Sequence, residues 1–493
     1  MKLWNTLAAA AAAVVLSASM ATPALAAPNT GETQANAQGT NATNTDAQDQ
    51  NKSKFKVPGA IGQRWKDLGG ETGAMGPARG EQKCDLRADA CSQEFEKGRL
   101  IWTPSNGRVH GIRGAIAARW DAAEAENGTF GYPISDENCT DAGCSQIFES
   151  GQIHFTEGED TFVVLSPILE AYGRTGDAAG PLGLPIAEMS CTLADDGCFQ
   201  TFQHGSIYYT PKTQSWFVQG PIGDKWAQGK WENGDLGFPA GDTFCRLKDE
   251  GCFQTFQNGS IYWTKDKGAA KVGGPIGDYW GTQGWELGWL GFPTGDQGSS
   301  DRGSWQTYEG GNLYLMKDTE DVRAVRGDIL ARWGEHGYEN GDLGWPLTGE
   351  FCDLRDGGCA TQFENGSIYW TPETGAHVVK GRIRDAWAEK GWENGYLGYP
   401  TSEEDCSIGG ETDACFQTFQ FGSIYWSRAT GPYAVPGTIM KAWGAEGYER
   451  GDLGFPVSDL RYEMRDGAKV FFQEFEHGFV EYTQGNTPSV VMK

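Results

Sequence analysis

A short phrase built around Leu-Gly-Phe-Pro recurs along almost the whole chain. It reads LGFP at residues 236–239, 290–293 and 453–456, and returns as AMGP, FGYP, LGLP, LGWP and LGYP at residues 74–77, 130–133, 182–185, 343–346 and 397–400. Successive copies are separated by 52 to 56 residues. A fixed period of this size is the signature of tandem structural units, so the phrase predicts a repeat protein rather than one large globular domain.

The beginning of the chain predicts an exported protein. One lysine precedes an apolar, alanine-rich run, and Ala24-Leu25-Ala26 fits the small-x-small pattern of a signal-peptide cleavage site. We assign residues 1–26 to a signal peptide and expect no transmembrane segment, because no later stretch approaches the ~20 apolar residues of a membrane span. Residues 27–56 are rich in Asn, Thr, Ala and Gln and predict a disordered spacer, since they can bury little apolar surface.

The remaining residues, 57–493, divide into eight units of similar length. Within one unit, Ile383 and Trp387 stand four apart, which places both on one face of a short helix. Gly and Pro then break the helix, and FQTF and SIYW alternate like the strands of a hairpin. We expect the units at residues 57–112, 113–165, 166–219, 220–273, 274–325, 326–380, 381–436 and 437–493.

Each unit is therefore expected to fold as a short helix plus a three- to four-stranded antiparallel sheet. The units would stack in a linear, stalk-like array, with a β-propeller-like ring as the alternative. The phrase itself forms the corner between helix and sheet, where its Gly and Pro residues provide the backbone conformation that the corner needs. These corner residues are Gly131, Pro133, Gly183, Pro185, Gly237, Phe238, Pro239, Gly291, Phe292, Pro293, Gly344, Pro346, Gly398, Pro400, Gly454, Phe455 and Pro456.

The twelve cysteines form six close pairs, one in each unit except the fifth and the eighth, which lack both members. Bonds between different units would have left unpaired cysteines, so we expect one local disulfide per pair, formed in an oxidising compartment and worth about 2–3 kcal/mol. The spacing does not fit zinc, and no metal site is expected. The pairs are Cys84/Cys91, Cys139/Cys144, Cys191/Cys198, Cys245/Cys252, Cys352/Cys359 and Cys406/Cys415.

Charge and motifs restrict the function. The formal net charge of −26 argues against nucleic acid and anionic lipid as partners and is compatible with neutral polymers, cations or simple solubility. No G-x-S-x-G elbow, HExxH helix or P-loop is present, so we expect no enzyme, no catalytic residue and no cofactor. A glycosidase needs only two carboxylates, and 66 acidic residues leave that possibility open.

The phrase, the FQTFxxGSIYWT strand pair and the period together resemble the LGFP-repeat family of exported actinobacterial proteins. The resemblance covers residues 57–493. It implies a secreted protein associated with the cell wall of a mycolic-acid-bearing bacterium. It also implies repeats that bind arabinogalactan–peptidoglycan polymer, as do the similar modules attached to mycolyltransferases and cell-wall hydrolases. This chain resembles the accessory module alone.

Two sets of residues are candidates for binding the polymer. Aromatic rings recur just before Glu in the loop that leads to the corner, and glutamines recur on the first hairpin strand. Rings stack on the apolar faces of neutral sugars while amides bond their hydroxyls. Core packing would produce the same recurrence, so both interpretations remain open. The candidates are Trp231, Trp285, Tyr338, Trp392, Tyr448, Gln200, Gln254, Gln306 and Gln417.

These observations favour a non-catalytic envelope protein that binds wall polymer multivalently and supports envelope integrity or anchoring. Several weak sites along one polymer give avidity without any tight single site. Two other functions fit the same sequence. One is a purely structural extracellular stalk or adhesin, and the other is a docking scaffold for other secreted envelope proteins.

Overall fold

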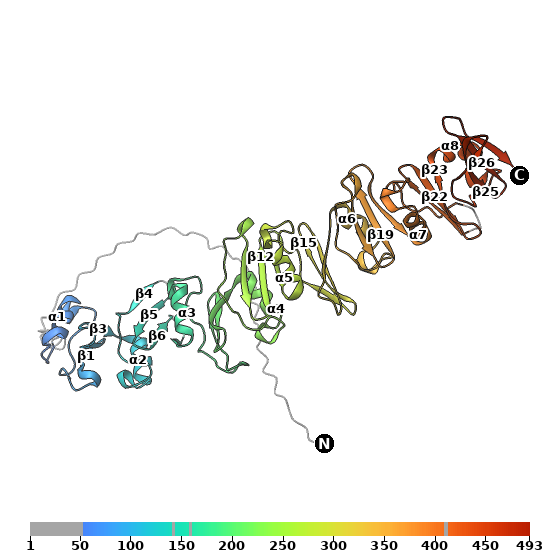
Figure 1. Cartoon of the computed structure of the whole chain (residues 1–493). Coiled ribbons are helices and arrows are strands. Elements are labelled where there is room, and N and C mark those ends of the chain that lie inside the picture. The colour runs from blue at the N-terminus through green and yellow to red at the C-terminus, as the bar shows by residue number, and fades with distance from the viewer. Residues whose placement is uncertain (1–52, 141–142, 157–159, 409–412) are drawn as a thin grey trace, which may run out of the picture. The chain divides into compact units, whose positions relative to one another are not determined.

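The structure is a computed structural model that describes residues 53–140, 143–156, 160–408 and 413–493. The predicted signal peptide and residues 27–52 of the predicted spacer lie outside the described residues. Eight α-helices occur among the described residues (Figure 1). They are α1 (Gly59–Asp67), α2 (Gly114–Ala122), α3 (Ile168–Thr175), α4 (Gly220–Gln228), α5 (Gly274–Thr282), α6 (Gly327–Glu335), α7 (Gly381–Glu389) and α8 (Gly437–Ala445).

The strands of the described residues form eight antiparallel sheets, none of them closed or curled, and each follows one helix in the chain. In chain order the sheets are β1 (Cys91–Phe95), β2 (Gly98–Trp102) and β3 (Val109–Ile112); β4 (Asn138–Thr140), β5 (Gly143–Phe148), β6 (Gly151–Phe155) and β7 (Thr161–Leu165); β8 (Cys198–Phe202), β9 (Gly205–Thr210) and β10 (Gln214–Gln219); β11 (Cys252–Phe256), β12 (Gly259–Thr264) and β13 (Gly268–Val272); β14 (Gly298–Ser300), β15 (Gly303–Tyr308), β16 (Gly311–Met316) and β17 (Val322–Arg326); β18 (Cys359–Phe363), β19 (Gly366–Thr371) and β20 (Gly375–Lys380); β21 (Ala414–Phe419), β22 (Gly422–Ser427) and β23 (Gly431–Pro436); and β24 (Arg461–Arg465), β25 (Ala468–Phe475), β26 (Gly478–Thr483) and β27 (Ser489–Met492). The predicted unit of one helix plus three or four strands is confirmed.

The loop before each meander is joined to it by a disulfide, by an additional strand, or by both. All six predicted cysteine pairs are disulfide-bonded. The two units without cysteines have an additional strand that pairs with the meander, β14 with β15 and β24 with β25. The second unit has both a disulfide and such a strand, β4 paired with β5. Strand pairing therefore holds the loop where the cysteines are missing.

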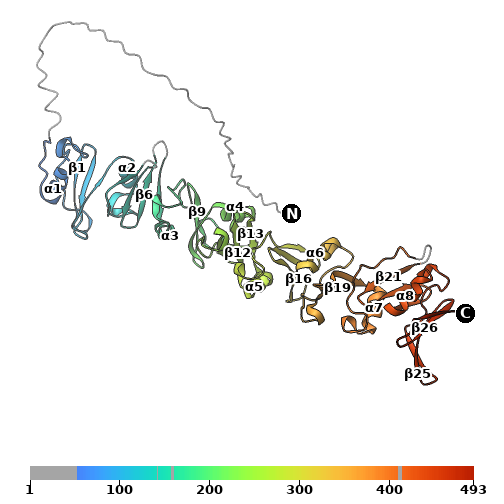
Figure 2. The same cartoon turned by 90° about the horizontal axis from the view of Figure 1, so that it is seen from above.

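Five of the described helices, α3, α4, α6, α7 and α8, contact both the preceding and the following sheet and join them. Helix α7 contacts β20 of the preceding sheet and β22 and β23 of the following one. Likewise, α4 contacts β10, β12 and β13, and it lies beside β12 in both views (Figures 1 and 2). Because neither sheet can cover its apolar face alone, such a helix contributes to the core of two units at once, as in other repeat proteins.

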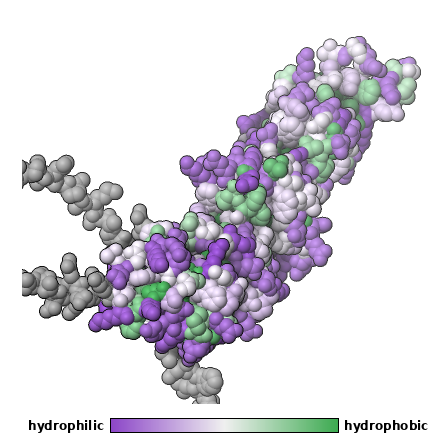
Figure 3. Space-filling view, turned by 90° about the vertical axis from the view of Figure 1, so that its left-hand side faces the viewer, coloured by the Kyte–Doolittle hydropathy of each residue, from purple (hydrophilic) through white to green (hydrophobic). Residues whose placement is uncertain are grey.

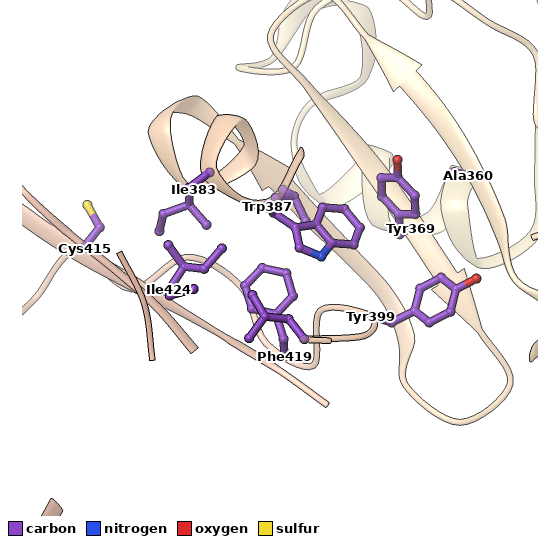
Figure 4. Packing of buried hydrophobic residues seen from close by; sticks show 12 residues of the cluster. Ala360, Tyr369, Ile383, Trp387, Tyr399, Cys415, Phe419 and Ile424 are labelled. Atoms are coloured by element: carbon purple, nitrogen blue, oxygen red, sulfur yellow. The ribbon is translucent and has the colours of Figure 1, made fainter. Parts of the chain in front are cut away.

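One aromatic side chain of each helix, Tyr172 in α3 and a tryptophan in the others, is the centre of this packing. Trp387 is fully buried, with its ring centroid 4.7 Å from that of Tyr369 on the preceding sheet and 5.4 Å from that of Phe419 on the following one. Ile383 and Ile424 lie on the side of the indole that faces away from Tyr369 (Figure 4). The predicted Ile–Trp spacing thus places both side chains in the core.

The recurring phrase closes the corner by hydrogen bonds as well as by packing. Gly237 has φ of +68°, a conformation that favours glycine, and its carbonyl accepts a hydrogen bond from the indole of Trp226 at 3.1 Å. The next residue, Phe238, is buried, and its backbone N–H donates to the Gln257 side chain at 2.9 Å. The same indole-to-glycine bond forms from Trp65, Trp120, Trp280 and Trp387 to Gly76, Gly131, Gly291 and Gly398.

Ion pairs connect successive units at the surface. A basic residue of one helix meets a carboxylate three residues after the proline of the next unit, at N–O distances of 2.5 to 3.6 Å. Exposed pairs of this kind each contribute at most about 1 kcal/mol, so they orient neighbours more than they stabilise them. The pairs are Arg64–Asp136, Arg119–Glu188, Arg174–Asp242, Lys225–Asp296, Arg332–Glu403 and Lys390–Asp459.

One buried histidine makes the stability of the second unit depend on pH. His154 on β6 is 1% exposed, and burial lowers its pKa to about 4 from 6.5. The folded state resists protonation of the His154 imidazole, so the free energy of unfolding is highest above pH 6.5. It decreases by about 3 kcal/mol in total as the pH falls towards 4. We expect His154→Leu to remove this part of the acid destabilisation, as measured by denaturant unfolding at pH 4 to 7. An identical pH profile for both proteins would contradict it.

Candidate functional site

The five loop aromatics begin short 3-10 turns that follow the helices. These turns are η5 (Trp231–Asn233), η7 (Trp285–Leu287), η8 (Tyr338–Asn340), η10 (Trp392–Asn394) and η11 (Tyr448–Arg450). The backbone of the first residue has φ between +52° and +56° in all five. Bulky residues rarely adopt this left-handed conformation, and the corresponding residue of the first unit is Gly70. Ala125 and Asp177 hold φ of +52° and +53° at the corresponding positions of the second and third units, so the turn itself imposes the conformation.

Four of these rings meet the tryptophan of the helix before them edge to face, and part of each ring remains exposed. They are Trp285, Tyr338, Trp392 and Tyr448. The rings of Trp280 and Trp285 meet edge to face at 5.4 Å, and a side chain in place of Gly281 would collide with Trp285. Trp285 is still 49% exposed and Trp231 51% exposed. Tyr338 and Tyr448 are also exposed, whereas Trp392 is half-buried. The loop aromatics are thus neither core residues nor free surface residues.

Two of these rings line equivalent cavities. The cavity beside Trp231 has a volume of about 270 Å³ and is also lined by Ser206 and Tyr208 of β9 and Asp224 of α4. The cavity beside Trp285 has a volume of about 200 Å³ and is lined by the corresponding residues Ser260, Tyr262 and Asp278. Both are small for a ligand pocket, and each could hold one small ring. We call them the Trp231 pocket and the Trp285 pocket.

The polar groups of the two pockets offer both hydrogen-bond donors and acceptors. Burial, and then the charge of Glu232, raises the pKa of Tyr208, so its hydroxyl stays protonated at neutral pH. Burial and Glu286 do the same for Tyr262. The exposed Asp carboxylates accept, and the Ser hydroxyls can do either. Among the described residues that line them, neither pocket has a lysine or arginine.

The predicted role of the glutamines requires correction. All four candidates are fully buried, so a ligand hydroxyl cannot reach them. The side-chain N–H₂ of Gln254 donates to the Phe217 carbonyl of the preceding unit at 2.7 Å and to the Gly241 carbonyl at 2.9 Å. The same two bonds bridge neighbouring units at Gln200, Gln306 and Gln417. The amide is recurrent because it satisfies two buried carbonyls.

Seven matches to the LGFP repeat model account for most of residues 75–451. They cover residues 75–128, 130–180, 182–234, 236–288, 290–341, 343–395 and 397–451. The chain belongs to the LGFP repeat family. Each matched LGFP repeat runs from the corner phrase through the sheet to the next helix and its 3-10 turn. The Trp231 and Trp285 pockets therefore each lie within one matched repeat, residues 182–234 and 236–288.

Solved structures with similarity to the LGFP chain are distant. PorZ, a surface component of the type-IX secretion system of Porphyromonas gingivalis, is 7% identical with a TM-score of 0.14, over 82% of this chain and 48% of that one. The extracellular domain of the putative one component system BT4673 from B. thetaiotaomicron is 9% identical with a TM-score of 0.11, over 85% and 60%. The LGFP chain thus spans about half to three fifths of their lengths. The comparison with curated proteins finds no match.

Disulfides and family membership together indicate where the LGFP protein acts. Six disulfides suggest an extracellular protein, and LGFP repeats suggest association with the cell envelope. Within the part of the chain that the structure describes, no helix is long and apolar enough to span a membrane.

Proposed function

We propose that this LGFP protein is a non-catalytic, secreted component of the envelope of a mycolic-acid-bearing bacterium. It binds arabinogalactan–peptidoglycan polymer through several weak sites on its repeats and so supports anchoring or envelope integrity. The proposal is carried by the two equivalent pockets, each with a half-exposed indole beside hydroxyl and carboxylate groups. A flat apolar ring surrounded by hydrogen-bonding groups matches a neutral sugar, which has apolar C–H faces and a polar rim.

The surface and the charge of the chain are consistent with a neutral polymer. Hydrophilic side chains cover most of the face seen in Figure 3, and the hydrophobic patches between them are small. The net charge of −26 repels polyanions at a distance. Repetition compensates for weak single sites, because a polymer that leaves one site is held near the next.

The purely structural alternative rests on a different observation. Glutamine bridges and ion pairs join neighbouring units, and such contacts would also suit a spacer that binds nothing. A docking scaffold for other envelope proteins would use the same surface. Neither alternative places a sugar on the exposed indoles, so both predict that removing the indoles has no effect on polymer binding.

The test is co-sedimentation of the protein with insoluble arabinogalactan–peptidoglycan. We expect the wild type to sediment and the Trp231→Ala/Trp285→Ala variant to lose affinity by about fivefold or more, because each ring contributes about 0.5–1.5 kcal/mol and the two losses combine. Tyr462→Ala, which removes an exposed ring outside the loops, is the matched control and should sediment like the wild type. Thermal unfolding monitors the fold of all three. Equal sedimentation of the double variant, or none by the wild type, would contradict the proposal.

A further inference from the structure

One helix position differs between the two repeats that contain the Trp231 and Trp285 pockets and the three later repeats that also have a loop aromatic. The residue after the buried isoleucine is glycine in the two helices that line pockets, Gly223 in α4 and Gly277 in α5. Larger side chains occupy this position in the three later helices, although each is also followed by a loop aromatic. They are Leu330, Arg384 and Met440.

The arginine in α7 occupies the space that is empty beside the glycines. The Arg384 guanidinium lies over the Trp392 ring, 5.5 Å from its centroid, and its Nε donates to the Ser367 hydroxyl at 3.1 Å. Ser367 corresponds to the pocket serines Ser206 and Ser260, which are half-exposed, but it is fully buried itself. The side chain of Arg384 thus covers the two groups, an indole and a serine hydroxyl, that line the pockets elsewhere.

We infer that the Trp231 and Trp285 pockets are the sugar sites of this chain, and that the side chain at the Gly223/Gly277 position decides which LGFP repeats bind. The inference rests on the proposed function and adds to it the repeats that act and the class of ligand. Glycine leaves the indole face open, whereas arginine closes it from within the same repeat.

The chemistry of the open pockets selects a neutral sugar. The indole stacks on the apolar face of a sugar ring, the Asp224 or Asp278 carboxylate accepts from its hydroxyls, and the serine hydroxyl donates or accepts. A uronate or a sugar phosphate would bring its own negative charge against that aspartate, with no lysine or arginine among the lining residues to compensate. Neutral sugars are therefore favoured over anionic ones.

The Trp231 pocket adjoins a second cavity. A cavity of about 380 Å³ shares His204, Gln219 and Gly220 with the Trp231 pocket and is lined on its far side by Trp263 and the Cys245–Cys252 disulfide. The two cavities thus open on either side of one rim. A chain of two or more sugars can place one ring in each, so an oligosaccharide should bind better than a monosaccharide.

The test measures saturation transfer to soluble oligosaccharides by NMR, which detects millimolar binding. The probes are neutral arabinan and galactan tetrasaccharides, with arabinose, galactose and an oligogalacturonate for comparison. We expect transfer to at least one neutral tetrasaccharide, less to the monosaccharides and none to the galacturonate. Gly223→Arg/Gly277→Arg should lower the signal at least fivefold while both indoles remain. Arg384 shows that α7 holds an arginine at this position. In α4 and α5 the new Cβ would lie 3.3 and 3.2 Å from the Cγ1 atoms of Val218 and Val272, so thermal unfolding of the variant checks its fold.

A rescue variant keeps the test independent of misfolding. Adding Arg384→Gly to the double arginine variant should uncover Trp392 and Ser367 and restore at least half of the lost signal. Unchanged transfer in the double variant, no restoration by Arg384→Gly, or equal transfer to the galacturonate would overturn the inference. No transfer to the wild type would do so as well, even if the protein sediments with polymer. Transfer without sedimentation would count against the proposed function alone.

Discussion

Trp387→Ala is expected to destabilise the seventh unit by about 3–5 kcal/mol, the usual cost of removing a large buried aromatic side chain. The indole is fully buried and touches both neighbouring sheets, and it donates the 3.1 Å hydrogen bond to the Gly398 carbonyl. Its loss therefore weakens the core of two units at once. Because an array of repeats need not unfold in one step, the measurement should be local, namely hydrogen exchange of the amides in α7, β20 and β22.

An exposed substitution provides the comparison for Trp387→Ala. Leu287 is 77% exposed, and Leu287→Ala should change stability by less than about 0.5 kcal/mol. Amide protection in α7 that survives Trp387→Ala would show that the helix tryptophan is not the centre of the packing. Faster exchange confined to α7 and its two sheets would agree with coupling between nearest neighbours.

Gly237→Ala is expected to cost about 2–4 kcal/mol, the second large effect. A Cβ at this position would lie 2.3 Å from the Gln257 side-chain oxygen, at a backbone φ of +68°. The collision displaces the amide that accepts from the Phe238 N–H, so a strained backbone and a lost hydrogen bond add together. Denaturant unfolding of the variant measures the cost.

Gly268→Ala separates the two causes. Gly268 has φ of +75°, but nothing lies within 4 Å of the position that its Cβ would take. This substitution carries the backbone cost alone, about 1 kcal/mol. Equal destabilisation by both changes would mean that the contact with Gln257 is unimportant and that the corner requires glycine for its conformation only.

Local features of this protein could be predicted from its sequence. The four-residue spacing of Ile383 and Trp387 predicted the helix and its buried face, because helical periodicity depends on the backbone alone. The joint absence of both cysteines from two units predicted pairing within units, and the six disulfides confirm it. The repeated phrase predicted a corner, and Gly237 has the conformation that such a corner needs.

Only the tertiary structure decided which recurring side chains a ligand can reach. Gln254 and Trp231 recur with the same period, yet Gln254 is buried between two units and Trp231 is half-exposed. Gly223 and Arg384 occupy one helix position, and their effect on the neighbouring ring appears only when β9 or β19 is in place. The physical reason is that burial depends on contacts with residues roughly 20 to 40 positions away in the chain. The periodicity within one unit does not show which residues make those contacts.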